Sequence, residues 1–187
     1  TLERLISDMV RNKAIEGVTK GWNPLKTANE IKSIVSSTPG HRLNNAMRTL
    51  QMQSYRSADA LQIKENERIL DGHIRIAALD TRTCMSCIAL HGERLAVGER
   101  VNDHHQGRCT SIAIIKGRDP RNIKPGREWF ASLPESKQLE IAGPGKLEGL
   151  RTGRFTWEDF PKRYDNKVFG EMITEASIKD IEARRGL

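Results

Sequence analysis

All three cysteines of this 187-residue chain and two of its five histidines lie in two short stretches, residues 80–87 and 103–109. Cys84 and Cys87 form a C-x-x-C pair, and His104 and Cys109 follow in a second stretch. Thiolates and a neutral imidazole from two short stretches are the ligands of a closed tetrahedral zinc site. The spacing therefore predicts a structural zinc ion held by Cys84, Cys87, His104 and Cys109, with His105 as the alternative histidine ligand.

The cysteines allow three other interpretations. A disulfide between Cys84 and Cys87 leaves Cys109 unpaired, which is unusual for an oxidised protein. A thioredoxin-like redox pair gives His104 and Cys109 no role. Reduced cysteines buried as small apolar side chains remain the simplest alternative. Zinc is favoured because it uses all four residues.

Catalytic constellations are less well supported. A zinc deaminase needs a His-x-Glu sequence, which the chain lacks. A ββα-metal nuclease is a closer rival, since Asp103-His104-His105 resembles its general-base strand. Such an enzyme also needs a second metal-binding His or Asn on a following helix, and no histidine follows His105, which leaves only Asn122 and Asn166. No phosphate-binding glycine loop is present. A zinc ion with four protein ligands has no open position, so we expect a structural site and no enzyme activity.

The composition fits a mixed helical protein with a lean core. Hydrophobic residues make up 37% and only nine residues are aromatic. No apolar run is long enough for a membrane helix, and no signal peptide is visible. Three cysteines without a disulfide pattern fit a reducing cytoplasm. The net charge of +7 is interleaved with acidic residues, which predicts a solvated surface with non-specific nucleic-acid contact as a secondary expectation. The start at Thr1 rather than Met predicts a fragment or a processed product.

Apolar periodicity divides the chain into three segments. Residues 1–70 show helical spacing in three stretches and predict a helical arm. Residues 71–117 predict a zinc-binding small-sheet module, with a half-buried strand ending at Asp80, a short returning strand at 94–97 and a buried strand at 110–115. A proline- and glycine-rich linker at 117–126 spans the next boundary. Residues 118–187 predict a helical tail with three short helical segments. One of these stops at Gly143-Pro144, and the last runs from about Thr174 to Arg185.

At this point the residues resemble a family. Asp80-x-Arg82-Thr83-Cys84-x-x-Cys87, then His104-x-x-x-Arg108-Cys109, is similar to the signature of Mu F-like phage minor head (head morphogenesis) proteins. Arg48-Thr49 resembles an upstream segment of the family, and the Trp129 and Gly153 regions resemble its tail. Two positions depart from the pattern: Gly107 stands where many members have a further cysteine, and Leu50 replaces a glutamate.

The resemblance implies a low-copy prohead protein associated with the portal vertex, with DNA contact in some relatives. Arg108 would fix the loop that carries the ligands. We therefore expect an α+β protein, with a helical N-terminal arm, a small zinc-stapled β module and a helical C-terminal tail. The expected function is that of a minor capsid protein of a tailed phage, assembled in the host cytoplasm and located in the virion, in the capsid interior or at the portal vertex. Its expected partners are portal and other capsid proteins, and it would support prohead assembly and DNA packaging or ejection. The alternatives are a phage-borne nuclease or toxin module using Asp103 and His105, and a zinc-ribbon nucleic-acid binder.

Overall fold

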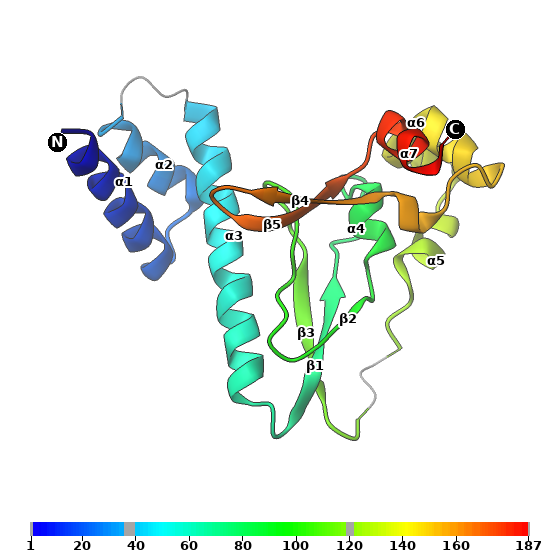
Figure 1. The fold of residues 1–187 in the computed structure, drawn as a ribbon, viewed down its shortest axis with the longest axis horizontal. Helices are drawn as coiled ribbons and strands as arrows, with labels where there is room; N and C mark the ends of the chain where they lie inside the picture. Colours follow the sequence, from blue (N-terminus) through cyan, green and yellow to red (C-terminus); the bar gives the residue numbers. More distant parts are fainter. Residues whose placement is uncertain (1, 36–39, 119–121, 187) are drawn as a thin grey trace. The chain divides into compact units, whose positions relative to one another are not determined.

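The computed structural model describes residues 2–35, 40–118 and 122–186, and it contains both helices and sheets (Figure 1). The elements in chain order are α1 (Leu2–Thr19), α2 (Pro24–Lys32), α3 (Gly40–Glu65), β1 (Leu70–Ile76), α4 (Met85–Ala89), β2 (Arg94–Leu95), β3 (Thr110–Ile115), α5 (Gly126–Ala131), α6 (Glu135–Arg151), a 3-10 turn (Trp157–Asp159), β4 (Pro161–Asn166), β5 (Gly170–Glu175) and α7 (Ile178–Arg185). The expected α+β class is confirmed. Residues 119–121 of the expected linker lie outside the described part.

The chain forms two compact units. The first contains residues 1–55 and 105–107, and the second contains 56–104 and 108–187. Their boundary crosses α3, so this helix contributes residues to both units. The three-segment division at 70/71 and 117/118 stays a prediction.

The first unit contains α1, α2 and the first half of α3. Asn23 caps α2, because its side chain accepts a hydrogen bond from Leu25 N at 2.9 Å and Pro24 occupies the first helical position. Thr27, Ala28 and Ile31 form the buried face of α2. Loop 105–107 joins this unit through Gln106 N, which donates to Thr49 Oγ1 at 3.0 Å. Thr49 of the Arg48-Thr49 pair thus serves as a buried hydrogen-bonding group.

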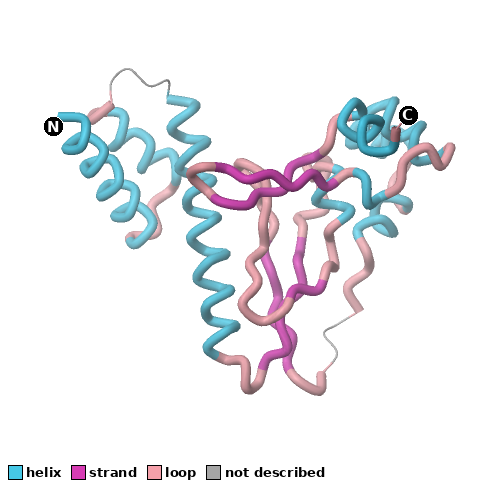
Figure 2. The backbone as a smooth tube through the Cα atoms, in the orientation of Figure 1, coloured by secondary structure: helices cyan, strands magenta, loops and turns pink. Residues whose placement is uncertain are grey.

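The second unit contains an antiparallel sheet of order β2-β1-β3, with β1 at its centre (Figure 2). The sequence predicts a half-buried strand here, because His73 and Arg75 alternate with the apolar side chains of Ile74 and Ile76. The structure corrects this, because His73 and Arg75 are each only 1% exposed. β1 is buried on both faces, and its polar side chains find partners inside the protein.

The C-terminal segment contains a β-hairpin as well as helices. β4 and β5 pair antiparallel, from Pro161 opposite Glu175 to Asn166 opposite Gly170. This hairpin was not expected from the sequence, and it explains why the last helix begins at Ile178 rather than near Thr174. Gly143 has the non-helical φ of 71°, so the expected interruption is present, although α6 continues beyond it to Arg151.

The largest apolar core joins this C-terminal segment to α4. Met85 and Ile88 of α4 are fully buried, and they pack in one cluster with side chains from α5 through α7. The main buried members from the later elements are Phe130, Ala142, Leu147, Phe155, Phe160, Ala176 and Ile181. The short helix that follows Cys84 is thereby fixed by residues far away in the sequence.

Candidate metal centre

The N-terminus of α4 positions the first two cysteines. Cys84 is the N-cap residue, and its Sγ accepts a hydrogen bond from Cys87 N at 3.4 Å. Before it, Thr83 Oγ1 accepts from Asp80 N at 2.9 Å and closes a tight turn. At a helix start of this kind, the N-cap residue and the third residue of the helix lie on the same side. The C-x-x-C spacing therefore brings the sulfur atoms of Cys84 and Cys87 close together.

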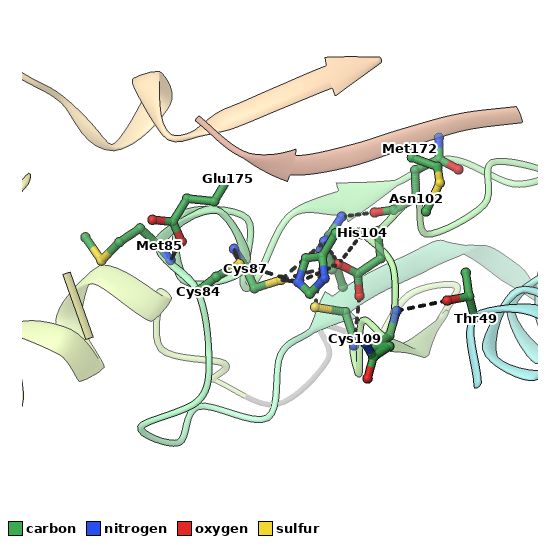
Figure 3. Close-up of polar contacts among 12 residues, drawn as sticks. Thr49, Cys84, Met85, Cys87, Asn102, His104, Cys109, Met172 and Glu175 are labelled. Carbon is green, nitrogen blue, oxygen red and sulfur yellow. Dashed lines mark hydrogen bonds and ion pairs between the residues drawn. The ribbon is translucent and has the colours of Figure 1, made fainter. Parts of the chain in front are cut away.

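His104 faces both sulfur atoms (Figure 3). Its Nε2 lies 3.5 Å from Cys84 Sγ and 3.5 Å from Cys87 Sγ. In a tetrahedral zinc site with ordinary bond lengths, a sulfur and a nitrogen ligand are separated by about 3.6 Å. The two sulfur–nitrogen distances are close to this value, and the three side chains form one of two groups that could hold a metal ion.

Cys109 belongs to the second group, together with Cys87 and Asp103. The structure thus gathers Cys84, Cys87, His104 and Cys109 (the cysteine–histidine cluster) in two overlapping groups that share Cys87. Neither group contains His105, which is exposed in the loop assigned to the other compact unit. Of the two histidines that the sequence left open, His104 is the one that faces the sulfurs.

Asp103 is completely buried and fully engaged. Its carboxylate accepts from Arg56 Nη2 at 2.9 Å and from the backbone N–H groups of His104 at 2.9 Å and Cys109 at 3.1 Å. Arg75 Nη2 lies 3.5 Å from Oδ1 of the same carboxylate. Although burial opposes ionisation, the neighbouring His104, Arg75 and Arg56 lower the pKa of Asp103 overall. Asp103 acts as an anionic support behind the cluster.

Arg75 links this carboxylate to the thiols. Its Nη2 lies 3.7 Å from Cys109 Sγ and 3.9 Å from Cys87 Sγ, and its Nη1 donates to the carbonyl of Asn102. Burial alone would lower the pKa of Arg75, but Cys109, Asp103 and Cys87 raise it overall. A buried guanidinium therefore balances the negative charge that thiolates bring to this point.

The thiols differ in acidity. A hydrogen bond with Cys87, supported by His104, lowers the pKa of Cys84 to about 5. Hydrogen bonds with Cys109 and Cys84, together with burial, raise the pKa of Cys87 well above its usual range. The pKa of Cys109 is lowered, chiefly through its hydrogen bond with Cys87. The pKa shifts of the three thiols thus have opposite signs, because each sulfur lies within hydrogen-bonding reach of another.

Asp80 and Arg108 join the two loops that carry the ligands. Arg108 donates from both terminal nitrogens to the Asp80 carboxylate, at 2.7 and 2.6 Å. Asp80 also accepts from Arg82 N at 3.0 Å and from Thr83 Oγ1 at 3.1 Å. A bidentate pair of this kind fixes orientation as well as distance. Arg108 thus has the loop-fixing contacts that the resemblance implied.

Sequence reasoning did not identify Arg56, Arg75 or Glu175 as part of this centre. Glu175 in β5 accepts from Met85 N at 2.7 Å and also pairs with Lys146 of α6. The sequence contained a signal for Arg75 alone: a charged residue between the apolar residues of a strand is rarely buried without a partner. The other two could not be found, because their partners lie 47 and 90 residues away in the chain.

The fold and the site define an α+β protein whose central sheet and short helix carry a cysteine–histidine cluster that could hold a metal ion. The chain belongs to the Phage Mu protein F like family, whose model matches residues 8–128. At the level of this family it is a phage head morphogenesis protein, associated with the virion and with other capsid proteins. No curated protein and no solved structure gives a significant match. Within the described residues, no helix has both the length and the apolar character needed to cross a membrane.

Proposed function

We propose that the protein is a minor capsid protein of a tailed phage that acts in prohead assembly near the portal vertex. Family membership supports a structural role in the head. The observation that carries the proposal further is the convergence of Cys84, Cys87 and His104 beside Cys109, in a segment that the family match covers.

Cys84, Cys87, His104 and Cys109 would hold zinc, which when bound supplies a cross-link between loop 80–87 and loop 104–109. The sulfur–nitrogen distances of 3.5 Å fit this ion. Four protein ligands leave no position for a reacting water molecule, so the site would stabilise the fold rather than catalyse a reaction. Such a staple matters for a sheet that has only three strands.

DNA packaging or ejection would be a secondary role. The net charge of +7 supports location beside packaged DNA. The nuclease alternative loses support, because both oxygens of Asp103 already accept hydrogen bonds from buried donors. A general base or an open metal ligand needs an oxygen that faces solvent or substrate.

The proposal is tested by capture on an immobilised portal protein, with zinc measured in the same sample. We expect about one zinc ion per chain and retention on the portal. Zinc should be lost in Cys84→Ser and in His104→Ala, and retained in the matched control His105→Ala. Cys109→Ser tests whether Cys109 is a ligand. It should lower the zinc affinity of a four-ligand site and leave that of a three-ligand site unchanged. Absence of portal binding by zinc-loaded protein, or DNA cleavage abolished by His105→Ala, would contradict the proposal.

A further inference from the structure

A group of lysines surrounds one tryptophan ring in the first compact unit, apart from the candidate metal centre. Lys26 Nζ lies 4.3 Å from the centroid of the Trp22 ring, Lys20 Nζ lies 5.5 Å from it and Lys13 Nζ lies 5.9 Å from it. We call these four residues the Trp22–lysine cluster. All four belong to residues 1–55, so the cluster is contained in a single unit.

Two helices and the turn between them position the cluster. One lysine comes from α1, one from the turn that follows it, and one from the first turn of α2. The two helices pack against each other (Figure 1). The main chain of Trp22 is held at both ends, because its N–H donates to Gly17 O at 2.8 Å and its carbonyl accepts from Gln51 Nε2 at 3.4 Å. The half-buried indole therefore keeps the three ammonium groups in one region.

The acidic residues nearby do not balance these lysines. Glu16 accepts from Lys13 Nζ at 2.8 Å and from Lys20 Nζ at 2.7 Å, and these two hydrogen bonds lower the pKa of Glu16 to about 2. The charge of Glu30 also acts on Lys13. Within the described residues, no ion pair joins Lys26 to a carboxylate. The cluster thus keeps an excess of positive charge.

The position of Lys26 opposes the stability of α2. Lys26 is the third residue of this helix, and the first turn contains no acidic side chain. The N-terminus of a helix carries a partial positive charge, so acidic residues are favoured there and cations are unfavourable. Residues 1–55 contain eight lysines and arginines against four aspartates and glutamates, and this net charge of +4 is more than half of the total of +7. A charge that contradicts a local stability rule is typical of a functional site.

The types of side chain favour phosphate over carboxylate as the anion. The cations of the cluster are all lysines, and the compact ammonium group binds phosphate as a point charge. Arginine, whose planar fork matches a carboxylate, is absent from the cluster. Because Lys26 lies over the indole ring, a bound nucleic acid would meet ammonium groups first, through its backbone rather than its bases.

We propose that the Trp22–lysine cluster binds the phosphate backbone of double-stranded DNA, with Lys26 as the main contact. The proposal rests on the DNA role of the proposed function and gives it a place in the fold, whereas portal binding does not depend on it. A phosphate draws the Lys26 ammonium group away from the indole ring and replaces the cation–π contact by an ion pair. Such contacts do not read the bases, so DNA of any sequence binds.

Fluorescence anisotropy of a labelled short DNA duplex, measured over a range of salt concentrations, tests the proposal. Loss of one phosphate contact weakens binding about eightfold at about 0.1 M salt and reduces the slope of log affinity against log salt by about 0.9. We expect both changes in Lys26→Gln. The matched control is Lys32→Gln, which removes the same charge from an exposed position at the other end of α2 and should keep the wild-type slope.

The emission of Trp22 gives a second measurement. It should change when DNA is added, and the change should be absent in Trp22→Phe, with circular dichroism showing that each variant is folded. Absence of DNA binding by the wild type would overturn the proposal, as would equal losses in Lys26→Gln and Lys32→Gln. Equal binding of polyglutamate would also overturn it, because the cluster would then suit an acidic protein. Portal capture of Lys26→Gln should match that of the wild type, which separates this test from that of the proposed function.

Discussion

At the level of single residues, the candidate metal centre places several charged side chains in the protein interior. Asp103, Arg56 and Arg75 are almost completely inaccessible to water, and the thiolates that a metal requires would add further negative charge. Ions in a protein interior are tolerated only when they are paired and hydrogen-bonded. Arg75 provides the pairing, because one guanidinium reaches the Asp103 carboxylate and the sulfurs of Cys87 and Cys109.

Removing that guanidinium should be costly. In Arg75→Met, Asp103 and the sulfurs lose a buried cationic partner, and we expect a loss of about 3–5 kcal/mol in the free energy of unfolding. Zinc affinity should fall by about 10–100-fold, the usual effect of losing a residue that supports the ligands. Urea unfolding and competition with a chelating dye measure the two effects. The control Arg82→Met, at a side chain that is 79% exposed, should behave like the wild type. Equal stability of the two variants would contradict the assigned role of Arg75.

The Asp80–Arg108 pair should respond to pH. The hydrogen bonds from Arg108, followed by those from Thr83 and Arg82, hold the pKa of Asp80 well below its usual range. A carboxyl with a folded-state pKa below the unfolded value of about 3.9 stabilises the fold above that pH, and this contribution is lost as the pH falls. Carboxyl NMR titration should therefore give a midpoint below that of a free aspartate. Arg108→Leu should raise the midpoint, whereas Arg82→Leu, which keeps the backbone donor, should change it little. An unchanged midpoint in Arg108→Leu would refute the pairing.

At the level of elements, α4 has two functions at once. Cys84 and Cys87 at its start belong to the cysteine–histidine cluster, while Met85 and Ile88 belong to the apolar core of the C-terminal segment. A five-residue helix is too short to be stable alone, so its position depends on these contacts. The hairpin strand β5 fixes it further, because Glu175 accepts from the first backbone N–H of α4.

Glu175→Ala should loosen the cysteine turn. It leaves the Met85 N–H and the Lys146 ammonium without their acceptor, so we expect the free energy of unfolding to fall by about 1–3 kcal/mol. Glu175→Gln keeps a neutral acceptor for Met85 and should lose less. Thermal unfolding of the zinc-loaded protein compares the two with Glu171→Ala, a control at a 51% exposed side chain on the same strand. The contact would be unimportant if Glu175→Ala and Glu171→Ala unfolded alike.

At the level of the whole molecule, the family match and the C-terminal core meet at α4. The match ends at residue 128, whereas most of the core side chains that pack on α4 come from residues beyond it. We therefore expect a structural change in the cysteine–histidine cluster to alter the packing of a part of the chain that the family model does not cover. Met85 and Ile88 directly follow Cys84 and Cys87 in the chain, so we expect a shift of either cysteine to move its neighbour in the core.

Metal removal should test that coupling. Treatment with a strong chelator under reducing conditions should lower the melting temperature and should also shift the fluorescence of Trp129 and Trp157, which pack against the C-terminal core. Trp22→Phe is the appropriate background for this measurement, because it removes the tryptophan of the first unit. Re-addition of zinc should restore both signals. Chelation that unfolded the cluster and left this fluorescence unchanged would show that the core is independent of it.

The sequence by itself determined the types and spacing of the candidate ligands, the family signature and most helices. These features are local: C-x-x-C at a helix start, apolar periodicity and proline or glycine breaks act within a few residues of one another. Only the tertiary structure decided that Arg75 is buried, that His104 rather than His105 faces the sulfurs, and that β4 and β5 form a hairpin. Those outcomes depend on partners far apart in the chain, such as Glu175 and Met85, 90 residues apart. Burial of a charge is set by what covers it, and no local pattern contains that information.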